Sequence, residues 1–294
     1  MRRLIPLLAL VALLASLLAG CTVNGTVQET EEERQSFQVG ASPRVIVESF
    51  NGRISVVSGS DGTVEARVNK RGSGTSSDTA KDDLANVIVD FDQIGDRITI
   101  TARRADPGRI LGNSGADVDV TVPAASSVEL RTQNGRVEAA NVEGKILVRT
   151  SNGPITTRGG KDLDLDTTNG QIAVNNPSGR LSLRTSNGGI DILAAKEVSV
   201  VAETSNDPIT FSGTLAPGPH SFTTRNGDID LTLPGDAAFT FDGQTSNGSV
   251  RTEFGDLVVS DTSILGHTGK DPTPEVTVIA RTSNGDLAVM TQKP

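Results

Sequence analysis

The sequence predicts an all-β protein, a β-solenoid or β-helix-like stack of two-strand coils of about 18–20 residues behind a less regular N-terminal β region. Two observations lead to this fold class. A short corner built around asparagine recurs at a nearly constant spacing, and apolar residues alternate with polar ones on both sides of each corner. The composition agrees, since the 294 residues include 31 glycines but no tryptophan or tyrosine.

The corner appears nine times, with threonine or serine two residues before the asparagine and glycine or aspartate directly after it. From Asn134 onward the spacings between successive asparagines are 18, 17, 18, 19, 20, 21 and 37 residues. The last spacing is expected to hold two periods, with a degenerate corner near Phe254-Gly255. The structural corner asparagines are Asn51, Asn134, Asn152, Asn169, Asn187, Asn206, Asn226, Asn247 and Asn284.

Each corner separates two runs in which every second residue is apolar. A branched aliphatic residue stands three positions after the asparagine, as Ile155 and Ile172 do, and pairs such as Leu163 and Leu165 stand six and four positions before it. This alternation predicts two short strands, each with one buried face. His220 falls on an inward position, which predicts a packing residue rather than a catalytic base.

Two architectures fit this pattern. Asn-Gly between alternating strands is a strong signal for a tight hairpin, and a series of hairpins would form a meander. In a solenoid, each period is one coil, and the same residue of every coil stacks about 4.8 Å from the next. Asparagine would then supply a left-handed corner conformation and an amide that bonds to its neighbours. The near-constant period and the repeated corner residues favour the solenoid.

The chain before the regular repeat is also predicted to be β structure. Strand-like runs occur between residues 38 and 125, interrupted by a polar insertion over 70–83 in which Ser77 or Asp78 could cap one short helix ending near Ala85. This part is expected to close the N-terminal end of the stack, because an open stack exposes unpaired strand edges. No composition break marks a second domain, so residues 38–292 are predicted to be a single solenoid domain.

The start of the chain predicts export. Arg2 and Arg3 precede a 16-residue apolar run, which ends in Leu18-Ala19-Gly20-Cys21. These residues resemble the lipobox of bacterial lipoproteins, in which the cysteine carries a diacylglycerol and cleavage occurs just before it. The resemblance implies a signal peptide over 1–20 and lipidation of Cys21, the only cysteine; a generic signal peptide with a chance cysteine is the alternative. Residues 21–37, with four clustered glutamates, predict an acidic flexible spacer.

Beyond the lipobox, the chain resembles the bacterial putative-adhesin β-strand-repeat family, a domain of unknown function. The resemblance rests on Ser36-Phe37-Gln38-Val39, on the strand Phe50-Asn51-Gly52-Arg53-Ile54, on Val122-Pro123 and on the repeated Ser-Asn-Gly-x-Ile copies. It covers roughly residues 36 to 290. It implies an all-β, solenoid-like fold and an envelope location.

The composition excludes several kinds of chemistry. A single cysteine rules out an intramolecular disulfide or a zinc site built on paired thiolates. A net charge of −9 and the lack of tryptophan and tyrosine argue against a nucleic-acid partner. Asp162, Asp164 and Asp166 share one strand face, but alternate residues lie about 6.8 Å apart, so a solvated face is favoured over a calcium site. No catalytic residue, cofactor-binding residue or metal ligand is predicted, and no cofactor is expected.

These observations predict a non-catalytic envelope lipoprotein, exported and lipid-anchored to a bacterial membrane. Its solenoid would display a surface for adhesion or interaction, or serve a structural role, toward an envelope or cell-surface protein or glycan. The alternative is a carbohydrate-active β-helix enzyme, a polysaccharide lyase or hydrolase. A cleft with two converging carboxylates and a perturbed pKa would favour the enzyme.

Overall fold

The computed structural model describes residues 26–108, 112–270 and 274–292. The predicted signal peptide, Cys21 and the first residues of the predicted spacer lie outside this described part. No helix within it is long and apolar enough to cross a membrane.

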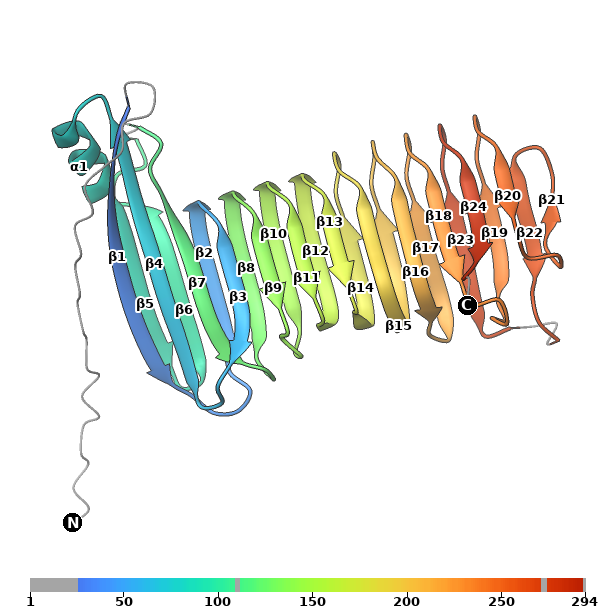
Figure 1. The fold of residues 1–294 in the computed structure, drawn as a ribbon, viewed down its shortest axis with the longest axis horizontal. Coiled ribbons are helices and arrows are strands. Elements are labelled where there is room, and N and C mark those ends of the chain that lie inside the picture. The colour runs from blue at the N-terminus through green and yellow to red at the C-terminus, as the bar shows by residue number, and fades with distance from the viewer. Residues whose placement is uncertain (1–25, 109–111, 271–273, 293–294) are drawn as a thin grey trace, which may run out of the picture.

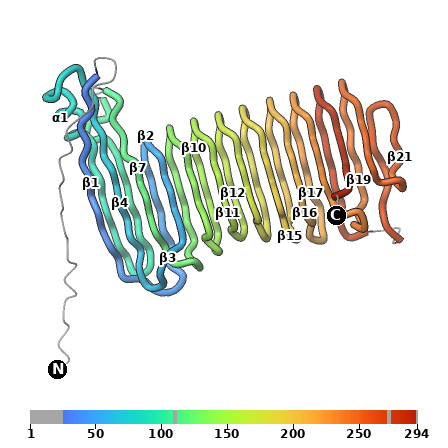
Figure 2. The backbone as a smooth tube through the Cα atoms, in the orientation of Figure 1, coloured from blue at the N-terminus to red at the C-terminus, as the bar shows by residue number. Residues whose placement is uncertain are grey.

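The described residues form one helix and 24 strands, in an elongated stack of flattened coils (Figures 1 and 2). The helix is α1 (Ser77–Ala85). The strands are β1 (Val27–Gln38), β2 (Arg44–Asn51), β3 (Ile54–Gly59), β4 (Thr63–Gly74), β5 (Val87–Ile94), β6 (Arg97–Arg104), β7 (Gly115–Pro123), β8 (Ser127–Asn134), β9 (Val137–Ala140), β10 (Ile146–Asn152), β11 (Ile155–Arg158), β12 (Lys161–Asn169), β13 (Ile172–Asn175), β14 (Ser178–Arg184), β15 (Ile190–Glu203), β16 (Ile209–Leu215), β17 (Gly218–Thr223), β18 (Ile229–Leu233), β19 (Thr240–Gln244), β20 (Val250–Thr252), β21 (Val258–Val259), β22 (Ser263–His267), β23 (Val276–Arg281) and β24 (Leu287–Thr291).

The coils present two faces. The strands that precede each corner form face A, in the spatial order β5, β6, β2, β8, β10, β12, β14, the end of β15, β17, β23, β19, β22 and β21. The strands that follow each corner form face B, in the order β1, β4, β7, β3, β9, β11, β13, the start of β15, β16, β18, β24 and β20. Between β8 and β18 every pairing is parallel and joins equivalent positions of successive coils, so the solenoid prediction is confirmed and the hairpin meander is wrong.

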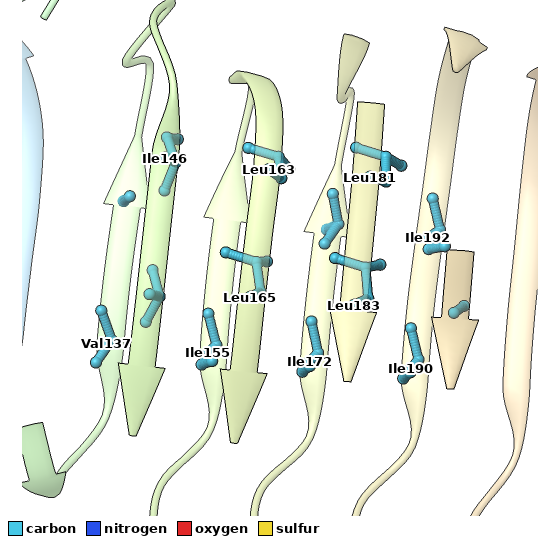
Figure 3. Packing of buried hydrophobic residues seen from close by; sticks show 14 of the residues in the cluster. Val137, Ile146, Ile155, Leu163, Leu165, Ile172, Leu181, Leu183, Ile190 and Ile192 are labelled. Carbon is cyan, nitrogen blue, oxygen red and sulfur yellow. The ribbon is translucent and has the colours of Figure 1, made fainter. Parts of the chain in front are cut away.

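The core is a set of stacked columns between the two faces. Figure 3 shows Val137, Ile155, Ile172 and Ile190 from face B in one row and Ile146, Leu163 and Leu181 from face A in another. All seven side chains are at most 1% exposed. Each buried aliphatic side chain contributes about 1.5–3 kcal/mol to folding. The alternation in the sequence therefore correctly predicts which side chains are buried in the core.

At the corners, the asparagine side chains form a continuous amide ladder. Along the stack, each Nδ2 after that of Asn134 donates to the Oδ1 of the preceding asparagine at 2.7–3.0 Å, in the order Asn134, Asn152, Asn169, Asn187, Asn206, Asn226, Asn284 and Asn247. The ninth predicted corner asparagine, Asn51, donates instead to Asn113 Oδ1 at 2.9 Å. The expectation of stacked amides is thus confirmed. The expectation that asparagine supplies a left-handed conformation is wrong, because the non-glycine residues with positive φ in the described part lie elsewhere, at Asn141, Asp162, Asn176, Ala194 and Glu197.

A second polar row runs just inside the amide ladder. The buried hydroxyl two residues before most corner asparagines donates to a carbonyl in the corner of the neighbouring coil, as Thr185 Oγ1 does to Gly170 O at 2.9 Å and Thr204 Oγ1 to Gly188 O at 2.9 Å. This bond satisfies a polar side chain that would be costly to bury alone. It explains why threonine or serine accompanies most of the asparagines; Thr150 Oγ1 is buried without a hydrogen-bond partner.

The stack order differs from the chain order at the C-terminal end. The coil formed by β23 and β24 lies between the coil of β17 and β18 and the coil of β19 and β20. Asn284 accordingly donates to Asn226 at 2.7 Å and accepts from Asn247 at 2.9 Å. The predicted degenerate corner near Phe254-Gly255 is therefore wrong. Phe254 instead closes the end of the core, packed edge-on against Phe239 with 5.2 Å between ring centroids.

The N-terminal end is closed in a comparable way. The first coil in the sequence, β2 and β3, lies between β6 and β7 on one side and β8 and β9 on the other. Antiparallel strands β1, β4 and β5 complete this end together with α1. The predicted helix is confirmed to Ala85; its N-cap is Ser76, whose hydroxyl accepts from the Thr79 amide.

The predicted acidic spacer is wrong over residues 27–37. All twelve residues of β1 pair with β4, so the solenoid begins before residue 38. Lys70, which is 8% exposed, places its Nζ 2.7 Å from Glu33 and 3.0 Å from Glu31. Burial lowers the pKa of Lys70, but the two carboxylates outweigh it, so the pKa lies above its ordinary value. Glu31 and Glu33 are therefore partners of a buried cation rather than solvated spacer residues.

Candidate interaction surface

The carboxylates singled out in the sequence do not converge. Asp162 Oδ1 accepts from the backbone N–H of Arg180 at 2.9 Å, and Asp164 Oδ1 pairs with Arg149 Nη2 at 2.9 Å. Within the described ranges, no group of three or more His, Cys, Asp or Glu side chains could hold a metal ion. Three further aspartates, Asp228, Asp230 and Asp286, gather at one corner near the C-terminal end.

That corner is held by its own backbone. Asp228 Oδ1 accepts from the N–H of Asp286 at 2.7 Å, and Asp286 Oδ1 accepts from the N–H of Ser249 at 2.9 Å. The hydrogen bonds from Ser249 lower the pKa of Asp286, whereas burial raises the pKa of Asp230, which also lies 3.5 Å from Arg251. These carboxylates thus fasten one coil to the next.

Charged side chains form a register-aligned row on face A, three residues before the corner asparagines. We call this row the charge ladder: Glu48, Arg131, Arg149, Asp166, Arg184 and Glu203. Arg131 pairs with Glu48 at 3.1 Å and Arg184 with Glu203 at 3.0 Å. Arg131 and Arg149 are direct neighbours in the ladder. Each binds a carboxylate of an adjacent row: Arg131 binds Glu129, and Arg149 binds Asp164.

These ion pairs add little stability. Exposed pairs contribute about 0–1 kcal/mol each, because water screens them and both side chains lose freedom. They do fix a row of mixed charge along a flat face. The charge ladder is therefore a feature of the surface rather than of the fold.

Two adjoining hollows run along face A beside the charge ladder. One has a volume of ≈ 320 Å³ and includes Arg44 and Glu129 in its lining; the other has a volume of ≈ 610 Å³ and reaches from Asp162 to Pro219. They share Lys145, so together they form one shallow channel across the strands, which we call the axial groove. Ser182, Ser199 and Val201 are among the residues that line its longer part.

One rim of the axial groove is cationic. Arg44, Lys145 and Arg180 each stand seven residues before a corner asparagine, so they occupy equivalent positions on β2, before β10 and on β14. Arg44 pairs with Glu129 at 2.7 Å. Hydrogen bonding from Arg44 lowers the pKa of Glu129, which keeps that carboxylate ionised at neutral pH.

The groove differs in charge from the rest of the molecule. Its lining contains the cations Arg44, Lys145, Arg180 and Arg184 and the anions Glu129, Asp162 and Asp164, which sum to +1 in a chain whose net charge is −9. Adding their ion-pair partners from the adjacent row, Arg131, Arg149 and Glu203, brings the sum to +2. Face A therefore carries a local cationic strip on an acidic protein.

Sequence reasoning missed this strip. The sequence located the corner asparagines, eight of which the structure brings into the amide ladder, but it gave no prediction for the positions seven residues before them. Aligning the copies on their asparagines would have shown basic side chains in three of them. The pairing of Arg44 with Glu129, 85 residues apart, needed the stack order as well.

His220 is a buried packing residue, as the sequence predicted. It is 1% exposed; its Nδ1 accepts from the Val200 N–H at 3.2 Å, and its Nε2 lies 2.8 Å from the Ala216 carbonyl. The two contacts together require the neutral ring with the proton on Nε2. Burial lowers the pKa of His220 below its ordinary value.

Stability is therefore expected to fall as the pH drops below about 6.5, the pKa of histidine in the unfolded chain. Below that pH the unfolded chain binds a proton that the folded chain rejects, which costs about 1.4 kcal/mol per pH unit until the lowered pKa is reached. Urea unfolding at several pH values between about 7.5 and 5.5 would measure this loss. H220Q should reduce the slope, and H267Q, at an exposed position, should leave it unchanged; equal slopes in all three proteins would contradict the assignment.

Comparisons with known proteins come from a family model and from solved structures. A family model described as Toastrack DUF4097 matches residues 75–290. The chain is similar to a putative adhesin from Bacteroides fragilis, at 10% identity over 88% of this chain and 96% of that chain, with a TM-score of 0.42. It is also similar to a putative adhesin from Parabacteroides merdae (12% identity, 89% and 96% covered, TM-score 0.41). A third is a putative lipid binding protein from Parabacteroides distasonis (12% identity, 89% and 97% covered, TM-score 0.37). No curated protein matches the chain.

Proposed function

The chain belongs to the Toastrack DUF4097 family, and from that premise we propose that it is a non-catalytic interaction protein of the bacterial cell envelope that uses face A to bind a surface partner. The observation that carries this proposal is the strip along face A, where the charge ladder and the axial groove run side by side over consecutive parallel strands. An in-register stack holds these side chains at a fixed spacing. A rigid row of equivalent positions suits repeated, multivalent contact with an extended partner.

The non-catalytic part of the proposal is supported by the state of the carboxylates. Glu129 and Asp164 bind arginines, and Asp162, Asp228 and Asp286 accept backbone N–H bonds. A general acid would need its pKa raised toward neutrality beside a second carboxylate facing a substrate cleft. Asp230, whose pKa burial raises, lies on β18 of face B and outside the axial groove.

The test is binding of the purified full chain to isolated envelope material from the producing bacterium. R131E combined with R184E should reduce the fraction that sediments with the envelope, because both arginines belong to the charge ladder. R136E combined with R158E makes the same change of charge just before β9 and on β11, away from face A, and is the matched control. Equal binding by the two double variants and the unchanged chain would refute a role for face A.

We further propose that the chain is exported and held at a membrane by lipid on Cys21, which lies outside the described residues. The support is the basic start, the short apolar run and the Leu-Ala-Gly-Cys sequence. Two acyl chains give stable anchoring, whereas one is marginal. C21S is expected to move most of the protein from the membrane fraction to the soluble fraction, measured by immunoblotting after ultracentrifugation. T22S, beside it, should leave the distribution unchanged; unchanged membrane partitioning of C21S would contradict lipid anchoring.

A further inference from the structure

We propose that the axial groove binds a linear acidic polysaccharide, laid along the solenoid axis across the strands. This proposal rests on the proposed function of face A and assigns a chemical class to its partner. Its basis is the position, spacing and charge state of the side chains along the groove.

The cations of the rim recur at every second strand. Arg44 on β2 is the register partner of Ser127 on β8. Lys145, directly before β10, stands beside Ser127, because the residues directly after them, Val128 and Ile146, are register partners. Arg180 occupies the same row on β14, and Asp162, seven residues before Asn169, stands between Lys145 and Arg180 on β12 and accepts from the Arg180 N–H at 2.9 Å. Neighbouring strands lie about 4.8 Å apart, so successive rim cations are roughly 10 Å apart along the groove. A ligand that matches them is a polymer with one negative charge per such interval.

Two of these cations are available to a ligand. Lys145 and Arg180 are exposed and make no ion pair within the described part of the chain, whereas Arg44 is already bound to Glu129. The carboxylates of the groove are themselves occupied by arginines or by a backbone N–H. Asp162 keeps its negative charge, because a backbone N–H does not neutralise a carboxylate, so the two unpaired cations Lys145 and Arg180 leave a net charge of +1 on the rim.

The floor of the groove favours a hydroxyl-rich ligand. Ser182 and Ser199 offer hydroxyl donors and acceptors, and Asp162 and Asp164 keep carboxylate lone pairs beyond the single hydrogen bonds they accept. Val201, which is half-buried, adds a small apolar surface against which a ring can lie. This mixture of hydroxyls, carboxylate acceptors and small apolar patches suits a sugar chain.

A nucleic acid fits the groove less well. Duplex DNA carries one charge per about 1.7 Å of its axis, far denser than cations about 10 Å apart can match. The overall charge of −9 repels such a polymer, and the chain contains no tryptophan or tyrosine on which bases could stack. A sparsely charged polyanion avoids both penalties.

The test measures binding of the purified full chain to immobilised polymers. Hyaluronan, with one carboxylate per disaccharide, is the main probe; polygalacturonate, with one per monosaccharide, neutral dextran and poly(dT) are the comparisons. K145E combined with R180E is expected to weaken hyaluronan binding at least about tenfold. R158E combined with K196E, which makes the same change of charge at exposed positions outside the groove, should change it less than about twofold.

The possible outcomes distinguish an incorrect ligand assignment from an incorrect binding surface. Binding to hyaluronan that is lost in the groove variant and kept in the control supports the proposal. No binding to either acidic polysaccharide, an equal loss in both double variants, or tighter binding to poly(dT) would overturn it. If the full chain binds envelope material through face A yet binds neither polysaccharide, only the assignment of the ligand fails. If R131E with R184E leaves envelope binding unchanged, the function of face A itself fails.

Discussion

Deletion of residues 274–294 is expected to unfold the coil of β19 and β20 rather than merely shorten the protein. The coil of β23 and β24 is an internal layer, since β23 pairs with both β17 and β19 and β24 with both β18 and β20. Removing it deprives two coils of their neighbours. It also removes Val278, Leu287 and Val289 from the core, where none of the three side chains is exposed.

The size of this effect follows from the apolar burial and the backbone hydrogen bonds that the deletion removes. Three large buried aliphatic side chains contribute about 1.5–3 kcal/mol each, and each backbone hydrogen bond adds about 1 kcal/mol. The total is on the order of 10 kcal/mol, comparable with the whole free energy of unfolding of a domain. Residues 240–252 should therefore lose protection from hydrogen exchange and become cleavable by trypsin at Arg251. Deleting only residues 293 and 294 should change neither readout, and a truncated chain that keeps its protection over 240–252 would contradict the stack order.

The stack order is also the part of the fold that the sequence could not supply. Every coil carries the same rows, with threonine or serine inside the corner, asparagine at it and an aliphatic residue three positions later. Any coil can therefore stack on any other with the same amide and carbonyl bonds, and local pattern does not distinguish a neighbour in sequence from a distant one. The inserted coils β2–β3 and β23–β24 are invisible to a prediction that assumes consecutive stacking.

The coils themselves were predictable because their signals are local. The alternation of apolar residues sets which side chains are buried, and nearly constant spacing sets the register. The same rule could have found β1, in which Glu29, Glu31 and Glu33 alternate in the run that ends at the buried Phe37. The clustering of these glutamates predicted a solvent-exposed spacer. Their partners, Lys70 and Ser77, lie on elements distant in sequence, so the local pattern does not show them.

The corner asparagines show how a residue type can have two structural causes. Asparagine is favoured both where the backbone is left-handed and where an amide can bond on two sides. Only the second reason applies at these corners. Left-handed residues lie elsewhere in the coil, and three of them, Asn141, Asn176 and Ala194, each stand seven positions after a corner asparagine. The asparagine therefore marked the right place while its first expected role was wrong.

Substitution of Gly170 by alanine is expected to destabilise the solenoid by at least about 3 kcal/mol, which lowers the melting temperature by about 5–10 °C. A Cβ at this position would lie 2.1 Å from the Gly153 carbonyl oxygen, 2.5 Å from its carbon and 2.9 Å from the Pro154 nitrogen. All three are backbone atoms, so no side-chain rotation can relieve the overlap. The Gly153 oxygen also accepts the hydroxyl of Thr167 at 3.1 Å, and displacing it would weaken that bond.

The effect should not stay local, because the corner glycines form a column. A Cβ on Gly153 would meet the Gly135 oxygen at 2.1 Å, and one on Gly188 would meet the Gly170 oxygen at 2.2 Å, so a coil pushed away from one neighbour is pushed into the next. G255A is the matched control, since nothing lies within 4 Å of the added Cβ there, and it should change stability by less than about 0.5 kcal/mol. Calorimetric melting of both variants would measure these two changes in stability. A loss below about 1 kcal/mol in G170A would mean that adjacent coils can separate at the corner by the width of a methyl group, which the continuous ladder of 2.7–3.0 Å amide bonds beside it does not allow.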